Sequence, residues 1–220
     1  MQIKSGTCMP VWTSAATSEP GRVSILPLRR ALKPAVFLTS LVPFGLLIVD
    51  FVFDRLGAEP IEEITHRTGT WGLTFLVITL AVTPVRRLTG WNAVIRLRRM
   101  LGLFAFFYVS LHFLTYIVLD QFFAFSFILE DVAERPYIMV GFASFLLLIP
   151  LAVTSTKGMI RRLGRRWTQL HRAIYLAAAG GVIHFLWQVK ADTRRPTIYG
   201  LVLVTLLAAR LVNVSKSHGR

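Results

Sequence analysis

The chain has 220 residues, and 54% of them are hydrophobic, above the roughly 45–50% that is typical of soluble domains. With long uncharged runs and a mean hydropathy of +0.59, this composition predicts an all-α, polytopic membrane protein. The net charge of +14 does not require a nucleic-acid partner, because the basic residues lie in short segments between apolar runs. The single cysteine, Cys8, excludes disulfide frameworks, thiolate metal sites, iron–sulfur clusters and covalently attached c-type haem.

The order of polar and apolar segments predicts a six-helix transmembrane domain over residues 34–213. Residues 1–33 are polar and mixed, without a run long enough for a signal peptide, and are predicted to be a flexible cytoplasmic lead-in. Residues 214–220 are predicted to be a cytoplasmic tail. The predicted transmembrane helices cover residues 34–53, 71–85, 101–119, 137–153, 173–189 and 197–212.

The distribution of charge predicts the orientation of these helices. If the N-terminus is inside, 19 of the 25 lysine and arginine residues lie in the inner segments or the helix ends next to them, and 10 of the 11 acidic residues lie in the outer segments or the helix ends next to them. Cytoplasmic loops of membrane proteins carry an excess of lysine and arginine. Both termini are therefore predicted to be cytoplasmic.

The stretch from Arg161 to Lys190 carries the first candidate site. A basic run is followed by an apolar segment with His171 at its start and His184 deep inside. An ionisable residue inside a membrane span is a functional candidate, and neutral imidazole is a common ligand for a metal or haem iron. Gly180 and Gly181 precede His184 by about one turn and are predicted to lie beneath its imidazole, leaving room for a flat porphyrin. A histidine that only hydrogen-bonds a neighbouring helix is an equally good interpretation of this stretch.

Helix geometry suggests a partner for His184. His112 follows Arg99 by the same number of residues as His184 follows His171, about 20 Å along a helix axis. The two helices are predicted to run in the same direction, so His112 and His184 should lie at one depth. Two imidazoles at one depth can bind one haem iron from opposite sides, which suits electron transfer and leaves no open position for oxygen chemistry.

His171 is predicted to lie near the inner surface, level with Arg98 and Arg99 and without a partner histidine. On an ideal helix it lies roughly 140° around the axis from His184, so the two need not share a cofactor. Arg98 and Arg99 are interpreted mainly as orientation signals. A less favoured interpretation is that they bind haem propionates or a flavin phosphate through charge-assisted hydrogen bonds.

Several blocks of the chain resemble the MsrQ (YedZ) family: RRMLGLFAFFYVSLHFLTY, RPY, TSTKGMIRRLGRRWTQLHRAIYL and IHFLWQVK, with the shorter GAEP, HRTG and VTPVRR. The resemblance covers roughly residues 35–200. Members of this family are haem-binding inner-membrane subunits of the bacterial periplasmic methionine sulfoxide reductase system, with a ferric-reductase-like transmembrane domain. The family places the protein in the bacterial inner membrane.

The resemblance implies b-type haem, with His112, His171 and His184 matching the haem-associated histidines of the family. It also implies an association with FMN, for which the chain shows no binding motif. In the wider ferric reductase group the corresponding helices each carry two histidines and hold two haems. Here Arg98 and Arg99 occupy the inner position. This departure leaves three roles open for His171: a weak ligand, a quinone site or a flavin site.

The leading hypothesis is a membrane electron-transfer subunit. Electrons would enter near the cytoplasmic face from quinol or reduced flavin, pass through haem b at His112 and His184, and leave to a periplasmic partner. Methionine sulfoxide reduction would belong to that partner, by resemblance a molybdenum-cofactor reductase, so no catalytic residue is predicted here. The chain has no G-x-G-x-x-G, so oxidation of a nicotinamide cofactor is not expected.

Two alternatives come from other classes of protein. One is a transporter that uses buried histidines as a proton relay. Against it, the sequence shows no pair of broken helices in matching positions and no visible internal repeat. The other is an anchor subunit without a cofactor.

Overall fold

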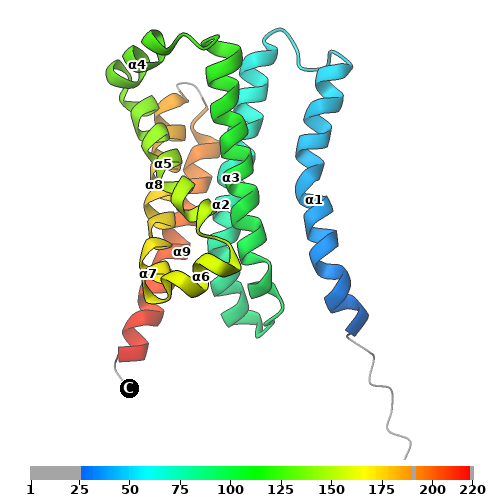
Figure 1. Cartoon of the computed structure of the whole chain (residues 1–220), viewed down its shortest axis with the longest axis vertical. Coiled ribbons are helices and arrows are strands. Elements are labelled where there is room, and N and C mark those ends of the chain that lie inside the picture. Colours follow the sequence, from blue (N-terminus) through cyan, green and yellow to red (C-terminus); the bar gives the residue numbers. More distant parts are fainter. Residues whose placement is uncertain (1–25, 190–191, 219–220) are drawn as a thin grey trace, which may run out of the picture.

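The computed structural model describes residues 26–189 and 192–218. In these two ranges every regular element is a helix (Figure 1). The elements in chain order are α1 (Leu26–Val52), α2 (Pro60–Thr89), the 3-10 helix η1 (Val94–Arg96), α3 (Arg98–Thr115), the π-helix η2 (Tyr116–Asp120), α4 (Phe125–Glu134), α5 (Pro136–Val153), α6 (Lys157–Leu163), α7 (Arg165–Leu170), α8 (Ala173–Gln188) and α9 (Arg194–His218).

Each of the six predicted apolar segments coincides with helical structure, namely α1, α2, α3 with η2, α5, α8 and α9 in that order. Among the described residues, four helical segments are long and apolar enough to cross a membrane: Ala31–Val52, Pro60–Thr89, Val94–Asp120 and Pro136–Val153. Over the described residues the structure thus confirms an all-helical fold with several helices long and apolar enough to cross a membrane.

Some helix boundaries differ from those predicted. α1 begins at Leu26, inside the predicted lead-in, and the first 25 residues of that lead-in lie outside the described ranges. α2 begins at Pro60, well before the predicted start, because proline is favoured at the first position of a helix. α9 continues to His218 and so covers most of the predicted tail.

The bundle is built from two pairs of helices. α2 packs along α3, and α5 packs along α8, while α9 contacts α8 and α2. α1 lies at the edge of the bundle (Figure 1). One end of the bundle carries α4 and is called the α4 end; the other carries α6 and α7 and is called the α6 end.

Small residues let α5 and α8 approach closely. Ala177 and Ala178 of α8 are fully buried. A Cβ atom added to Gly180 would collide with the side chain of Ser144 on α5. Such small residues are typical of helix interfaces in membranes, where packing rather than hydrophobicity holds helices together. This close contact fixes the position of the part of α8 that precedes His184.

The chain turns sharply at the α4 end between α3 and α4. The π-helix η2 extends α3, and Phe122 and Phe123 then adopt left-handed backbone angles with φ of 48° and 61°. Two consecutive bulky residues in this region are unusual and store strain that the surrounding structure must offset. The turn brings α4 back to α5, and residues of α4 line the cavity described next.

Candidate functional site

A cavity of about 760 Å³ lies inside the bundle toward the α4 end. Its walls come from α2, α3, α5 and α8, and α4 contributes Ile128, Leu129, Asp131 and Val132. Leu73, Leu76, Leu148 and Ala177 line it toward the middle of the bundle. This volume lies within the range of about 300–1,000 Å³ that is usual for small-molecule and cofactor sites.

His112 enters this cavity from α3. Its Nδ1 atom lies 2.9 Å from the carbonyl oxygen of Thr65 on α2. A carbonyl can only accept, so Nδ1 carries the proton and Nε2 keeps a lone pair for a metal. Gly69, one turn after Thr65, makes room for the ring, because a Cβ atom there would lie 3.0 Å from Nδ1.

His184 enters the cavity from α8 with the same local geometry. Its Nδ1 atom donates to the carbonyl oxygen of Tyr137 on α5, at 2.7 Å. Gly141, one turn after Tyr137, lies against the ring, and a Cβ atom there would be 2.8 Å from Nδ1. The Nε2 atom of His184 is therefore also free to bind a metal.

The two half-sites form a structural repeat. In each, a histidine binds a carbonyl 47 residues earlier in the chain, and a glycine one turn after that carbonyl faces the ring. The helix pair α2 and α3 supplies one half, and α5 and α8 supply the other. This likeness is confined to the contacts around the two histidines. Few residue types recur outside these positions, so the repeat is not visible as sequence similarity.

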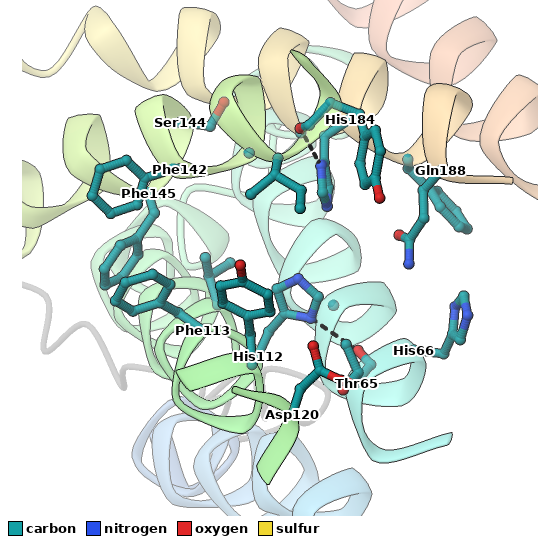
Figure 2. A pocket seen from close by; sticks show the side chains of 18 of the residues that line it. Thr65, His66, His112, Phe113, Asp120, Phe142, Ser144, Phe145, His184 and Gln188 are labelled. Atoms are coloured by element: carbon teal, nitrogen blue, oxygen red, sulfur yellow. Dashed lines mark hydrogen bonds between the residues drawn. The ribbon is translucent and has the colours of Figure 1, made fainter. Parts of the chain in front are cut away.

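The two imidazoles meet across the cavity. Their ring centres are 6.1 Å apart, with an angle of 73° between the ring planes. In each ring Nδ1 bonds a backbone carbonyl, and Figure 2 shows the other ring nitrogen pointing toward the other histidine. Two imidazoles that bind one metal ion from opposite sides through bonds of about 2 Å have their centres about 6 Å apart. The predicted meeting of His112 and His184 at one depth is confirmed.

The ligand set fits a porphyrin iron better than a bare ion. Among the described residues no group of three or more His, Cys, Asp and Glu side chains converges on one point. Haem iron takes four bonds from its own ring and needs one or two from the protein. The pair of imidazoles and the cavity between them therefore fit what a haem iron needs from a protein.

The predicted role of Gly180 and Gly181 needs correction. Neither glycine lies against the His184 ring; Gly141 of the neighbouring helix does. A Cβ atom on Gly181, which lines the cavity, would meet Leu73, and one on Gly180 would meet Ser144. Helix periodicity identifies neighbours within α8, but the side chain of His184 leans across to α5.

His171 lies at the α6 end, away from the cavity. Its Nε2 atom is 3.1 Å from the hydroxyl oxygen of Thr154, and its ring stacks on Trp167 with centres 4.0 Å apart. Burial lowers the pKa of His171, and the guanidinium of Arg98 lowers it further, so both favour the neutral imidazole. An effect of the Arg98 charge on His171 agrees with the prediction that the two residues lie at one level. Neither Arg98 nor Arg99 lines the cavity that contains His112 and His184.

The mouth of the cavity at the α4 end is polar. Asp131 accepts hydrogen bonds from the Tyr116 hydroxyl, at 3.1 Å, and from the Gln121 amide, at 3.4 Å. It also forms an ion pair with Arg135 at 3.2 Å. On the opposite side His66 contacts Glu62 at 3.3 Å. His66 precedes the predicted start of the second helix at residue 71, but it lies on α2, at the rim of the cavity (Figure 2).

Comparison with known proteins identifies the family. Residues 68–182 match the family described as ferric reductase like transmembrane component. The chain is 52% identical over 183 residues to the protein-methionine-sulfoxide reductase heme-binding subunit MsrQ of Herminiimonas arsenicoxydans. The chain belongs to the MsrQ family.

Other MsrQ proteins are similar over comparable lengths. The heme-binding subunit of Rhodospirillum rubrum is 55% identical over 179 residues, which is 81% of this chain and 86% of that protein. The one from Ralstonia nicotianae is 50% identical over 193 residues, 86% of this chain and 89% of that protein. For Herminiimonas arsenicoxydans the shares are 82% and 84%. The resemblance to MsrQ noted in the sequence is therefore confirmed over most of the chain.

Proposed function

We propose that this MsrQ-family protein binds a b-type haem between His112 and His184 and carries electrons through the membrane to a methionine sulfoxide reductase. The observation that carries the proposal is the 6.1 Å separation of the two ring centres, with both Nδ1 atoms bonded to backbone carbonyls. The relatives named above are heme-binding subunits, which supports the same cofactor here. When bound, haem supplies reversible one-electron transfer.

The protein's own residues position this chemistry. Thr65 and Tyr137 hold the two imidazoles in one tautomer and orientation, and such outer partners also raise the basicity of a ligand. Leu73, Leu76 and Leu148 line the cavity with apolar surface. A haem iron held by both His112 and His184 would have no open position, which would suit electron transfer rather than oxygen chemistry.

The proposal also includes orientation and partners. Six transmembrane helices would place both termini and the α6 end in the cytoplasm, because α6 and α7 carry the basic run that begins at Lys157. Electrons would enter at this end from quinol or reduced flavin, with FMN as the associated flavin. They would leave at the α4 end to a periplasmic, molybdenum-cofactor methionine sulfoxide reductase. The membrane would be the bacterial inner membrane.

A reduced-minus-oxidised absorption spectrum of the purified protein tests the haem assignment. The wild type should show a b-type cytochrome band that His112→Ala and His184→Ala each abolish. His171→Ala is the matched control, since its imidazole lies outside the cavity, and it should keep the band of the His112–His184 site. A wild type with no band would favour a carrier or an anchor subunit, and a band retained in both cavity variants would overturn the ligand assignment.

Flavin extraction tests the FMN proposal separately. Purified protein should release FMN on denaturation in a fixed ratio to haem if the flavin is a resident cofactor. Reduction of the haem by added reduced FMN or quinol, followed by its absorption band, distinguishes the two donors.

A further inference from the structure

The polarity of the cavity is graded along its length, and this grading bears on how a haem would lie in it. Toward the middle of the bundle the walls are apolar, with Leu73, Leu76 and Leu148. At the α4 end they include acidic, basic, amide and phenol side chains. Haem is amphiphilic in the same way, because its porphyrin is apolar and its two propionates lie along one edge. Burying an unpaired carboxylate among leucines is costly, so the propionate edge belongs at the polar mouth.

Arg135 is the cation best placed to meet a propionate there. Among the residues that line the cavity in the described part of the chain, it is the sole arginine or lysine. Its Nε atom pairs with Asp131 at 3.2 Å, and its Nη1 atom lies 3.5 Å from the Tyr137 hydroxyl. A guanidinium has five N–H donors in a planar fork that suits carboxylates, so these two contacts leave donors for another anion.

Arg135 stays cationic in this position. Its hydrogen bond with the Tyr137 hydroxyl raises its pKa, and the charge of Asp131 raises it further. The side chain is about half exposed, so it can adjust to a ligand that enters the mouth. A permanent charge and a partly exposed side chain both suit a residue that contacts the polar edge of a cofactor.

The electrostatics of the two helix starts at the mouth favour the same corner. The N-terminus of a helix carries partial positive charge, which stabilises nearby anions. The first turn of α2 already contains Glu62 and Glu63 and is preceded by Glu59. The first turn of α5, which follows Arg135 directly, contains no acidic residue. Near α2 the glutamates would repel an incoming propionate, whereas near α5 the one carboxylate that contacts Arg135, Asp131, is already paired with it.

We propose that Arg135 binds a propionate of the haem held by His112 and His184, so that the propionate edge faces the α4 end. This inference rests on the proposed haem function and adds the orientation of the cofactor. It places the polar edge of the haem at the mouth of the cavity, on the side from which electrons would leave. Arg135 is in this sense a positioning residue.

Titration of the full-length apoprotein in detergent with haem and with haem dimethyl ester tests the proposal. The two ligands share the porphyrin and the iron, but the ester has no carboxylate. Wild type should bind haem at least about tenfold more tightly than the ester, since a charge-assisted hydrogen bond is lost. Arg135→Gln should bind the two ligands about equally, and Arg135→Lys should recover part of the preference because it keeps the charge.

Arg55→Gln is the matched control. Arg55 is an exposed arginine in the segment between α1 and α2, and it contacts the ring of Phe53 rather than the cavity. This variant should keep the wild-type preference. No preference in wild type, or a preference retained in Arg135→Gln, would overturn the propionate assignment while leaving haem binding intact. Failure of both ligands to bind wild type would instead refute the haem function itself.

The midpoint potential gives a second readout that a purely structural role would not move. Loss of a cation next to the propionate favours the more positive, oxidised iron, so Arg135→Gln should have a lower potential than wild type. The shift should shrink as ionic strength rises, because the mouth is exposed. An unchanged potential in a variant that binds haem normally would also overturn the proposal.

Discussion

The hydroxyl group of Tyr108 on α3 donates a 2.8 Å hydrogen bond to the backbone carbonyl of Ser40 on α1. It also accepts a 3.1 Å hydrogen bond from the amide of Phe44. In a regular helix the amide of Phe44 would donate directly to the carbonyl of Ser40, four residues earlier. Pro43 lies in this turn, and proline lacks the amide hydrogen and bends helices. Tyr108 thus completes the backbone bonding of α1 from the helix that carries His112.

Removing this hydroxyl should loosen α1. Tyr108→Phe is expected to lower the free energy of unfolding by about 1 kcal/mol, because a buried hydroxyl that serves two backbone groups is lost. Denaturant unfolding in detergent micelles, followed by tryptophan fluorescence, measures the change. The control is Tyr175→Phe, because the Tyr175 hydroxyl is buried without a hydrogen-bond partner among the described residues. Tyr175→Phe should be neutral or slightly stabilising, and equal losses in both variants would contradict this account.

The glycines beside the imidazoles should be sensitive to a single methyl group. A Cβ atom on Gly141 would lie 2.8 Å from Nδ1 of His184, so Gly141→Ala must displace a ring that is already hydrogen-bonded. Overpacking of this kind costs about 1–3 kcal/mol, which corresponds to a loss of haem affinity of roughly 5- to 150-fold. Gly69→Ala should act in the same direction on His112.

Haem titration and the electron paramagnetic resonance spectrum of the oxidised protein measure this effect. Gly45→Ala on α1 is the matched control, because a Cβ atom there meets nothing within 4 Å. The control should keep wild-type affinity and spectrum. Wild-type behaviour of Gly141→Ala would mean that the His184 ring is not held at this position.

At the contact between α5 and α8, two substitutions should affect stability in a coupled way. Gly180→Ala should destabilise the protein by about 1–3 kcal/mol, because the new methyl group overlaps the Ser144 hydroxyl oxygen. Apart from that oxygen, the nearest atom to the added methyl group is the Cβ atom of Ser144, at an ordinary contact distance of 3.5 Å. The double variant Gly180→Ala, Ser144→Ala should therefore recover most of the lost stability. A double-mutant cycle with additive effects would rule out the collision.

Much of the fold follows from hydropathy because long apolar runs in a membrane protein have few alternatives to helix. The short helices α4, α6 and α7 were not predicted, since each is only about one to three turns long and lies beside polar loops. The early start of α2 at Pro60 was missed because the sequence before Trp71 is polar. In the structure Glu62 and Glu63 lie at the helix N-terminus, where acidic residues are favourable.

For the site, the rise per residue was sufficient to pair His112 with His184, because both helices cross the bundle in one direction. It could not identify Gly141, since that contact is made between helices. One signal was present in the sequence. Thr65 precedes His112 by 47 residues, Tyr137 precedes His184 by the same number, and a glycine lies one turn after Thr65 and one turn after Tyr137. A search for such equal spacings could have found the contacts between helices, which the periodicity of a single helix does not show.

Arg67 joins the last turn of α1 to the first turns of α2, and its loss should weaken that junction. Its guanidinium contacts Asp50 at 2.5 Å and Glu63 at 2.6 Å, and all three side chains are partly exposed. Arg67→Gln should therefore lower the free energy of unfolding by only about 1 kcal/mol at low salt. The difference from wild type should shrink as salt is added, because exposed charges are screened.

Arg55→Gln serves as the control, since the Arg55 guanidinium lies over the ring of Phe53 at 5.3 Å and should show no such salt dependence. A loss in Arg67→Gln that persists at 1 M salt, where the screening length falls to about 3 Å, would mean that packing of the arginine rather than its charge holds α1.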